Sequence, residues 1–194
     1  MFIRTFWFLR GLIFLLLLMA LVSCDDKEDA VKYKGTIIIS SEKKMQQGDI
    51  YVVYGYSFEK GKNVPYTLMG GSKPDIIVSN LTDIMNNITG AVLNSPDNEE
   101  AFYLNTTGTT YNEAKDWFDN YNEVTATNFK AISDSLELYQ VWTLQTAAGK
   151  YAKLLIKDIN TITGVSSEDY IDITVDFEYQ PDGTRIFRTN RSGS

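Results

Sequence analysis

The sequence predicts a mostly β domain of curved antiparallel sheets with one short packed helix. Residues 170–179 alternate between apolar and polar side chains, which is the pattern of a strand with one buried and one wet face. Residues 139–146 and 151–158 are two further strand-like runs, and the turn 147–150 between them indicates a hairpin. A clear helical pattern is confined to residues 111–121.

The N-terminal half of this domain adds shorter strands. Ranges 34–40 and 49–59 are rich in β-branched and aromatic residues, and Gly55 inside the second range indicates a bulge. We expect a loop over 61–72, because Gly70 and Gly71 interrupt any strand pattern there. Further short strands are predicted at 75–79, 90–94, 101–105 and 184–188.

The predicted helix begins at a capping box. Thr110 is followed three positions later by Glu113, so that each side chain can satisfy a free backbone N–H of the first turn. The apolar face of this helix consists of Ala114, Trp117, Phe118 and Tyr121. With about three turns, the helix needs to pack against a sheet to be stable. Residues 80–89 mix helical spacing with turn-forming asparagines, and we expect no long helix there.

The chain begins with a segment that is typical of secretory signals. Arg4 and Arg10 accompany an apolar run over 12–22, which is shorter than the roughly 20 residues that a membrane-spanning helix needs. Cys24 follows a small residue, and Leu21 lies three positions ahead of it. This arrangement resembles the lipobox of bacterial lipoproteins, in which the signal is removed and the cysteine is lipidated. An ordinary signal peptide with an incidental cysteine is the alternative.

An acidic run over 25–29 follows the cysteine. It resembles the export signal of Bacteroidota-type surface lipoproteins, which implies a protein anchored by its N-terminal lipid to the outer face of the outer membrane. A tether facing the periplasm is the alternative. We therefore divide the chain into a signal peptide (1–23), the lipidated Cys24 with an acidic tether (24–33), the β domain (34–188) and a polar tail (189–194).

Composition argues against several function classes. Without Arg4 and Arg10, 16 of the 18 basic residues remain against 25 acidic ones, and a net charge of −9 argues against binding nucleic acid. The chain has no histidine and a single cysteine, so Ser-His-Asp catalysis, histidine-ligated zinc and disulfides are ruled out. The acidic stretch 97–100 lacks the spacing of a calcium loop. We interpret Asp172 and Asp176 as part of a solvated sheet face, and we expect no enzyme.

Four sequence runs carry a resemblance to a known family. They are YQVWTLQT at 139–146, GKYAKLLI at 149–156, YQPDGT at 179–184 and YSFEKG at 56–61. The runs resemble the HmuY-like haem-binding lipoprotein family, closely over 139–187 and more loosely over 49–79. The family's Trp-Asp segment after the first long strand is replaced here by residues 73–77, which have no tryptophan.

The resemblance implies capture of haem and its delivery to an outer-membrane haem receptor. In the family, two side chains hold the iron, commonly histidines and in some members methionines. A thioether is an acceptable axial ligand of haem iron, and after the signal the methionines are Met45, Met69 and Met85. We expect Met69 and Met85 to be the pair; the alternative places Met85 in the core and Met69 in an exposed loop. Tyrosine is another iron ligand that the chain can offer.

Two other functions remain open at this point. The same fold can bind a ligand other than haem, such as another porphyrin, a glycan or a protein. The chain can also be an accessory structural subunit of an outer-membrane surface complex, which would show an exposed apolar patch and no pocket.

Overall fold

The computed structural model describes residues 33–46, 50–67, 73–164 and 168–187. The chain divides into two compact units, Met1–Ala30 and Val31–Ser194, and every element below belongs to the second. The predicted signal peptide, Cys24, the acidic tether up to Lys32, Met69 and the polar tail lie outside the described residues.

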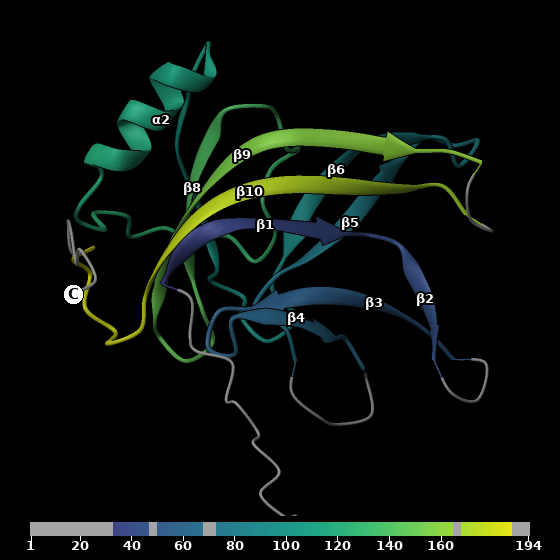
Figure 1. Cartoon of the computed structure of the whole chain (residues 1–194), viewed down its shortest axis with the longest axis horizontal. Coiled ribbons are helices and arrows are strands. Elements are labelled where there is room, and N and C mark those ends of the chain that lie inside the picture. Colours follow the sequence, from purple (N-terminus) through teal and green to yellow (C-terminus); the bar gives the residue numbers. More distant parts are fainter. Residues whose placement is uncertain (1–32, 47–49, 68–72, 165–167, 188–194) are drawn as a thin grey trace, which may run out of the picture. The chain divides into compact units, whose positions relative to one another are not determined.

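The described residues form ten strands and one helix. The strands are β1 (Lys34–Ser40), β2 (Lys43–Gln46), β3 (Ile50–Ser57), β4 (Lys62–Pro65), β5 (Ile77–Thr82), β6 (Ile88–Asn94), β7 (Phe102–Thr107), β8 (Gln140–Gln145), β9 (Tyr151–Ile162) and β10 (Tyr170–Gln180), and the helix is α2 (Tyr111–Asn120). They pair antiparallel in a five-stranded sheet β1-β10-β9-β8-β7, a three-stranded sheet β2-β3-β4 and a two-stranded sheet β5-β6 (Figure 1). The predicted mostly β fold with one short helix is confirmed.

The main core lies between one face of the five-stranded sheet and the two smaller sheets. Along β10, the apolar positions of the predicted alternation are buried: Ile171, Ile173, Val175, Phe177 and Tyr179. Phe58, directly after β3, places its ring 5.4 Å from the rings of Phe177 and Tyr179. Trp142 and Leu154 are paired across β8 and β9 and are fully buried in the same core. The alternating pattern of the C-terminal strands therefore predicts correctly which of their side chains are buried in the core.

The other face of this sheet carries α2 and is called the helix-covered face. Ala114 and Phe118 of α2 are buried against Val141 of β8 and Leu155 of β9. This confirms the predicted helix and two residues of its apolar face. At its start, the Thr110 hydroxyl accepts from the Glu113 N–H at 3.3 Å as predicted, but the Glu113 carboxylate accepts from the backbone N–H of the preceding Thr109.

A lysine is buried on the helix-covered face. Lys153 of β9 is 1% exposed, and its Nζ donates to the backbone oxygens of Phe118 (2.7 Å) and Tyr121 (3.0 Å) and lies 3.2 Å from the Glu178 carboxylate. The last turn of α2 has no basic residue of its own, so Lys153 supplies the cation that satisfies the carbonyls at the helix end. Burial lowers the pKa of Lys153, and the neighbouring Glu178 opposes that shift.

The polar side chains of β10 are not a solvated face as predicted. Asp176 is 13% exposed and accepts hydrogen bonds from Thr36 (2.5 Å) and Tyr111 (3.3 Å). It also forms an ion pair with Lys157 at 3.2 Å. The first residue of α2 and the neighbouring strands therefore cover this part of the sheet. An alternating strand shows which face is apolar, but it does not show what covers the polar one.

Several boundaries in the N-terminal half differ from the prediction. Gly55 pairs with Val64 without a register shift, so the predicted bulge is wrong; a Cβ there would lie 2.2 Å from the Ile76 carbonyl oxygen, and the glycine allows this close approach. Part of the predicted loop 61–72 is strand β4, and the polar strand β2 was not predicted. Residues 184–187 form only an isolated bridge, at Ile186. Residues 83–87 connect β5 and β6 without a helix, as expected.

Candidate functional site

A cleft opens where the ends of the three sheets meet. In Figure 1 the β2–β3 hairpin, the β5–β6 hairpin and the end of the β9–β10 connection lie on the same side, which we call the hairpin end. The cleft there has a volume of about 360 Å³. Its walls are formed by Ser41, Lys43, Val53, Val78, Ser79, Asn80, Thr82, Glu168, Asp169 and Tyr170. These residues come from β2, β3, β5, the start of β10 and the segments beside them, so the cleft exists only in the folded chain.

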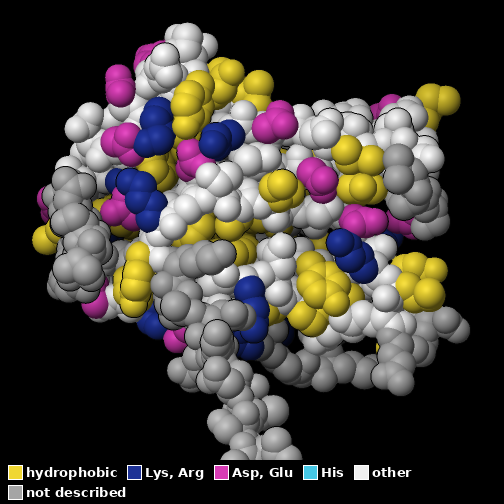
Figure 2. Space-filling view, in the orientation of Figure 1, with side chains coloured by type: hydrophobic (Ala, Val, Ile, Leu, Met, Phe, Trp, Pro, Cys, Tyr) yellow, Lys and Arg dark blue, Asp and Glu magenta, His cyan; other side chains and the backbone are white. Residues whose placement is uncertain are grey.

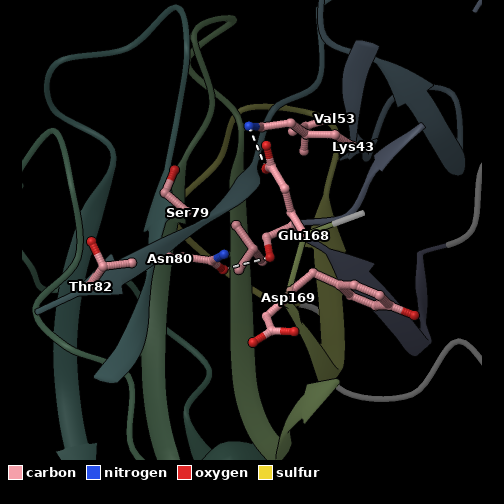
Figure 3. A pocket seen from close by; sticks show the side chains of 10 residues that line it. Lys43, Val53, Ser79, Asn80, Thr82, Glu168 and Asp169 are labelled. Carbon is pink, nitrogen blue, oxygen red and sulfur yellow. Dashed lines mark hydrogen bonds and ion pairs between the residues drawn. The ribbon is translucent and has the colours of Figure 1, made fainter. Parts of the chain in front are cut away.

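Ser41 holds three of these segments together. Its backbone N–H donates to the Ile171 carbonyl at 2.9 Å, and its hydroxyl accepts from the Ile171 N–H at 2.8 Å and donates to Asn80 Oδ1 at 2.6 Å. The end of β1 is thereby tied to both β10 and β5. Since Asn80 Oδ1 receives the serine proton, its Nδ2 is the group left to face a ligand (Figure 3).

An ion pair crosses the cleft. Lys43 of β2 donates to the Glu168 carboxylate at 2.7 Å, and both side chains are more than half exposed. Such a pair adds only about 0.2–1 kcal/mol to stability. Asp169 beside it accepts from the Gly164 N–H at 3.2 Å. Burial, and then the nearby acidic side chains, raise the pKa of the Tyr170 hydroxyl, which therefore stays neutral. With Lys43 neutralised, the cleft carries an excess of negative charge.

Polar groups on the β5 side of the cleft are available to a ligand. The hydroxyls of Ser79 and Thr82 and the Nδ2 group of Asn80 make no hydrogen bond to any residue that the structure describes. Figure 3 shows these three residues together on one side of the cleft, with Lys43 and Glu168 across from them. The arrangement offers hydrogen-bond donors and acceptors at the surface of a preformed hollow.

Met85 lies at the hairpin end as well. It is 76% exposed in the turn between β5 and β6, beside the fully exposed Ile84, and Leu81 on β5 is also exposed. The alternative that Met85 fills the core is therefore wrong. Met69 lies outside the described residues, and the separation of the two sulfurs is not defined by them. Leu81, Ile84 and Met85 are called the β5–β6 apolar tip.

A second exposed apolar group lies on the neighbouring hairpin. Met45 of β2 pairs with Tyr51 of β3, and both side chains are exposed together with that of Ile50. Figure 2 shows apolar side chains among polar ones at this side of the molecule. These three residues are called the β2–β3 apolar tip.

The two apolar tips and the cleft differ in the ligand chemistry that they fit. A porphyrin presents two apolar faces and needs largely apolar walls, whereas seven of the ten residues that line the cleft are polar or charged. With a volume of about 360 Å³ and a lining that mixes polar and apolar groups, the cleft suits a ligand smaller and more polar than a porphyrin. The β5–β6 apolar tip combines an accessible thioether with exposed aliphatic side chains.

The sequence singles out Met85, which lies at the hairpin end, but it does not predict the cleft. Ser41, Asn80 and Glu168 are far apart in the chain, and each is an ordinary loop or strand-end residue when it is read alone. What joins them is the antiparallel register of β1 with β10, which brings Ser41 next to Ile171. A cue of that kind is not present in the local sequence.

The part of the chain that the structure describes contains neither a clustered metal site nor a membrane-spanning helix. Among the described residues, no group of three or more Asp, Glu or Cys side chains is placed to hold a metal ion. In the acidic stretch 97–100, Asp97 pairs with Lys73, and Asn98 donates to the Gln145 carbonyl at 2.7 Å. No helix within the described ranges has the length and apolar character needed to cross a membrane.

Comparison with known proteins leaves the family open. No protein-family model matches the chain, and no curated protein matches it.

Proposed function

We propose that this protein is a non-enzymatic, ligand-binding lipoprotein anchored at the bacterial cell surface. The observation that carries the proposal is the hairpin end, where a preformed cleft, exposed apolar side chains and an accessible thioether lie on neighbouring hairpins. Such groups add little to the stability of the fold, and exposed apolar side chains that cluster often mark a binding surface. The signal-like N-terminus and the lipobox around Cys24 support export and lipid anchoring in the outer membrane.

Haem is the ligand that the resemblance to the HmuY-like family implies, and its transfer to an outer-membrane receptor is part of the same proposal. Met85 and Met69 would hold the iron, since thioether sulfur is a suitable axial ligand. Leu81 and Ile84 would offer apolar surface to the porphyrin and exclude water from it. When bound, haem would supply the iron centre that the receptor takes up.

A haemin titration tests this function. The soluble form that begins at residue 25 is titrated with haemin, and difference absorption is recorded in the oxidised and reduced states. We expect a saturable spectral shift that the double variant Met69→Ala/Met85→Ala loses. Met45→Ala is the matched control, since Met45 is also exposed but belongs to the other hairpin. Absence of a shift in both redox states would rule out haem as the ligand.

Lipid anchoring has its own test. In the full chain, Cys24→Ser should abolish incorporation of labelled palmitate and release the protein from the membrane fraction. Protease added to intact cells should degrade the unchanged protein if it lies on the outer face. Protection from protease in intact cells, with degradation after the outer membrane is opened, would place it in the periplasm.

A second candidate function is supported by the polar lining of the cleft. Its free hydroxyl and amide groups favour a ligand other than a porphyrin. The same surface-anchored fold would then bind a polar molecule.

A further inference from the structure

We infer that the polar cleft is a binding site for an uncharged, polyhydroxylated ligand, a sugar unit of a glycan, and that this site is separate from the methionines. The inference rests on the proposed function only in so far as the protein is a binding protein. Its basis is the cleft formed by residues around Ser41, Asn80 and Glu168.

The size of the cleft suits a small ligand. Ligand sites in proteins usually have volumes of about 300–1,000 Å³, and about 360 Å³ is near the lower limit. One or two sugar rings match that volume better than a porphyrin does. The rim is open, so that a longer glycan can extend from the cleft into solvent.

The hydrogen-bonding groups match a sugar. Sugar hydroxyls both donate and accept, and they are recognised best where donors and acceptors lie close together. Ser79 and Thr82 present hydroxyls that can do either. Asn80 presents a donor, because its oxygen is already bound to the Ser41 hydroxyl. Across the cleft, Asp169 presents a carboxylate that accepts.

The Asn80 donor is held in place by buried structure. Ser41 is 9% exposed, and its hydroxyl accepts from the Ile171 N–H and donates to Asn80 Oδ1. This network fixes the orientation of the Asn80 amide before a ligand arrives. A preorganised donor binds its ligand without the entropic cost of ordering a side chain.

The charges of the cleft disfavour anionic ligands. Lys43 is the cation of the cleft lining, and the Glu168 carboxylate lies 2.7 Å from its Nζ. Asp169 adds a further negative charge, and the Tyr170 hydroxyl stays protonated. A phosphate, sulfate or sialic acid group would meet repulsion here. The apolar C–H face of a neutral sugar can instead pack on Val53 or Tyr170.

An open groove on α2 is the main competing site. It is lined by Glu113, Asp116, Trp117, Asn120 and Tyr121, and the rings of Trp117 and Tyr121 stack at 4.6 Å. Aromatic rings beside acidic groups can also bind sugars. All of its residues come from one helix and its C-cap, however, and Glu113 is already used in the helix cap. The α2 groove is therefore a control for the cleft.

The experiment is a glycan array followed by calorimetry. The soluble form that begins at residue 25 is applied to immobilised neutral, sialylated and sulfated glycans, and the strongest neutral glycan is titrated in solution. We expect binding to neutral glycans, weakened at least tenfold by Ser79→Ala and by Asn80→Asp. Trp117→Ala and the double variant Met69→Ala/Met85→Ala should bind as the unchanged protein does. Melting temperatures of all variants show that the fold is retained.

Three results would overturn the inference. They are no binding to any neutral glycan, preference for sialylated or sulfated glycans, and loss of binding in Trp117→Ala while the cleft variants still bind. The haemin titration is independent of this outcome. A haem shift without glycan binding would leave the haem proposal standing and refute the cleft inference, and glycan binding without a haem shift would do the reverse.

Discussion

The helix-covered face and the hairpin end differ in which side chains are buried and in how completely their polar groups are hydrogen-bonded. On the helix-covered face, Lys153 is buried and has three acceptors within 3.2 Å, and Asp176 is also fully engaged. At the hairpin end, Ile84 and Met85 are exposed, while the hydroxyl of Ser79 makes no hydrogen bond to a described residue. The comparison separates residues that hold the fold from residues that are free to bind.

The difference follows from the energetic cost of leaving a polar group without a partner, which depends on whether the group is buried. A buried charge is costly unless it is paired and hydrogen-bonded, so the partners of Lys153 have to be complete. An exposed hydroxyl or thioether costs the fold almost nothing and remains available to a ligand. Substitutions should therefore change stability on the helix-covered face and binding at the hairpin end.

The largest expected effect is at Lys153. Lys153→Met should lower the free energy of unfolding by about 3 kcal/mol, because the carbonyls at the end of α2 lose their donor and Glu178 keeps only the more distant, exposed Lys34 as a partner. Adding Glu178→Gln should recover part of that loss. Urea unfolding measures both variants. Lys157→Met is the control, since Lys157 is more exposed and should cost much less; an equal loss would show that burial is not the cause.

The second-largest effect on stability is expected at Gly55, where β3 lies against the segment that leads into β5. Gly55→Ala should cost about 2 kcal/mol, because the new methyl group would lie 2.2 Å from the Ile76 carbonyl oxygen and the backbone has to move. Gly35→Ala is the matched control, since its Cβ would meet only Phe177 at an ordinary 3.5 Å. Similar melting temperatures for the two variants would contradict this explanation.

A smaller and pH-dependent effect is expected at Asp75. Its carboxylate accepts from the Phe58 N–H at 2.7 Å, but burial raises its pKa above the ordinary value of 3.8. The ionised form therefore costs stability at neutral pH, and this cost disappears below pH 3.8. Asp75→Asn should be more stable than the unchanged protein at pH 7 and equally stable at pH 3. Urea midpoints at both pH values measure the gap; a gap that does not change with pH would refute the assignment.

Asp83 at the hairpin end should show the opposite sign. Its carboxylate accepts from Asn87 and from the Met85 N–H, and these hydrogen bonds lower its pKa. The ionised form stabilises the turn above pH 3.8, and that contribution is lost as the pH falls through the lowered pKa. Asp83→Asn should therefore be slightly less stable at pH 7 and equal at low pH. Urea midpoints at pH 7 and at low pH measure this difference in stability. A variant that is more stable than the unchanged protein at pH 7 would contradict a stabilising role of the ionised Asp83 in the turn.

The smallest effect on stability is expected at the β5–β6 apolar tip. Ile84→Ser should change the free energy of unfolding by less than about 0.5 kcal/mol, because the side chain is fully exposed. Thermal unfolding measures the change. A loss of 2 kcal/mol or more would mean that the tip packs against the fold and is not free to bind.

The fold was largely predictable from the sequence. The alternation of β10, the turn between β8 and β9 and the helical pattern that begins after Thr110 are local signals, and the structure contains all three elements. The strand β2 was missed because Lys43–Gln46 carries almost no apolar pattern. The bulge at Gly55 was wrong because the glycine allows a close approach of Ile76, which forms an isolated bridge with the adjacent Tyr56 of β3.

The functional region was harder to predict, for a physical reason. Lys153 looks like a surface lysine in the sequence, and its burial depends on α2 ending above it, more than 30 positions earlier in the chain. The cleft depends in the same way on Ser41 meeting Asn80 and Ile171. The burial of Lys153 and the cleft both arise from contacts between distant segments, and local sequence patterns do not predict such contacts.

Hydrogen–deuterium exchange with and without ligand tests most directly whether the hairpin end is the binding region. The soluble form is measured alone, with haemin, and with the neutral glycan selected on the array. We predict slower exchange with haemin in the peptides that cover the β5–β6 hairpin, slower exchange with glycan around Ser41 and Asn80, and no change over α2. Slower exchange over α2, or no change with either ligand, would contradict the account.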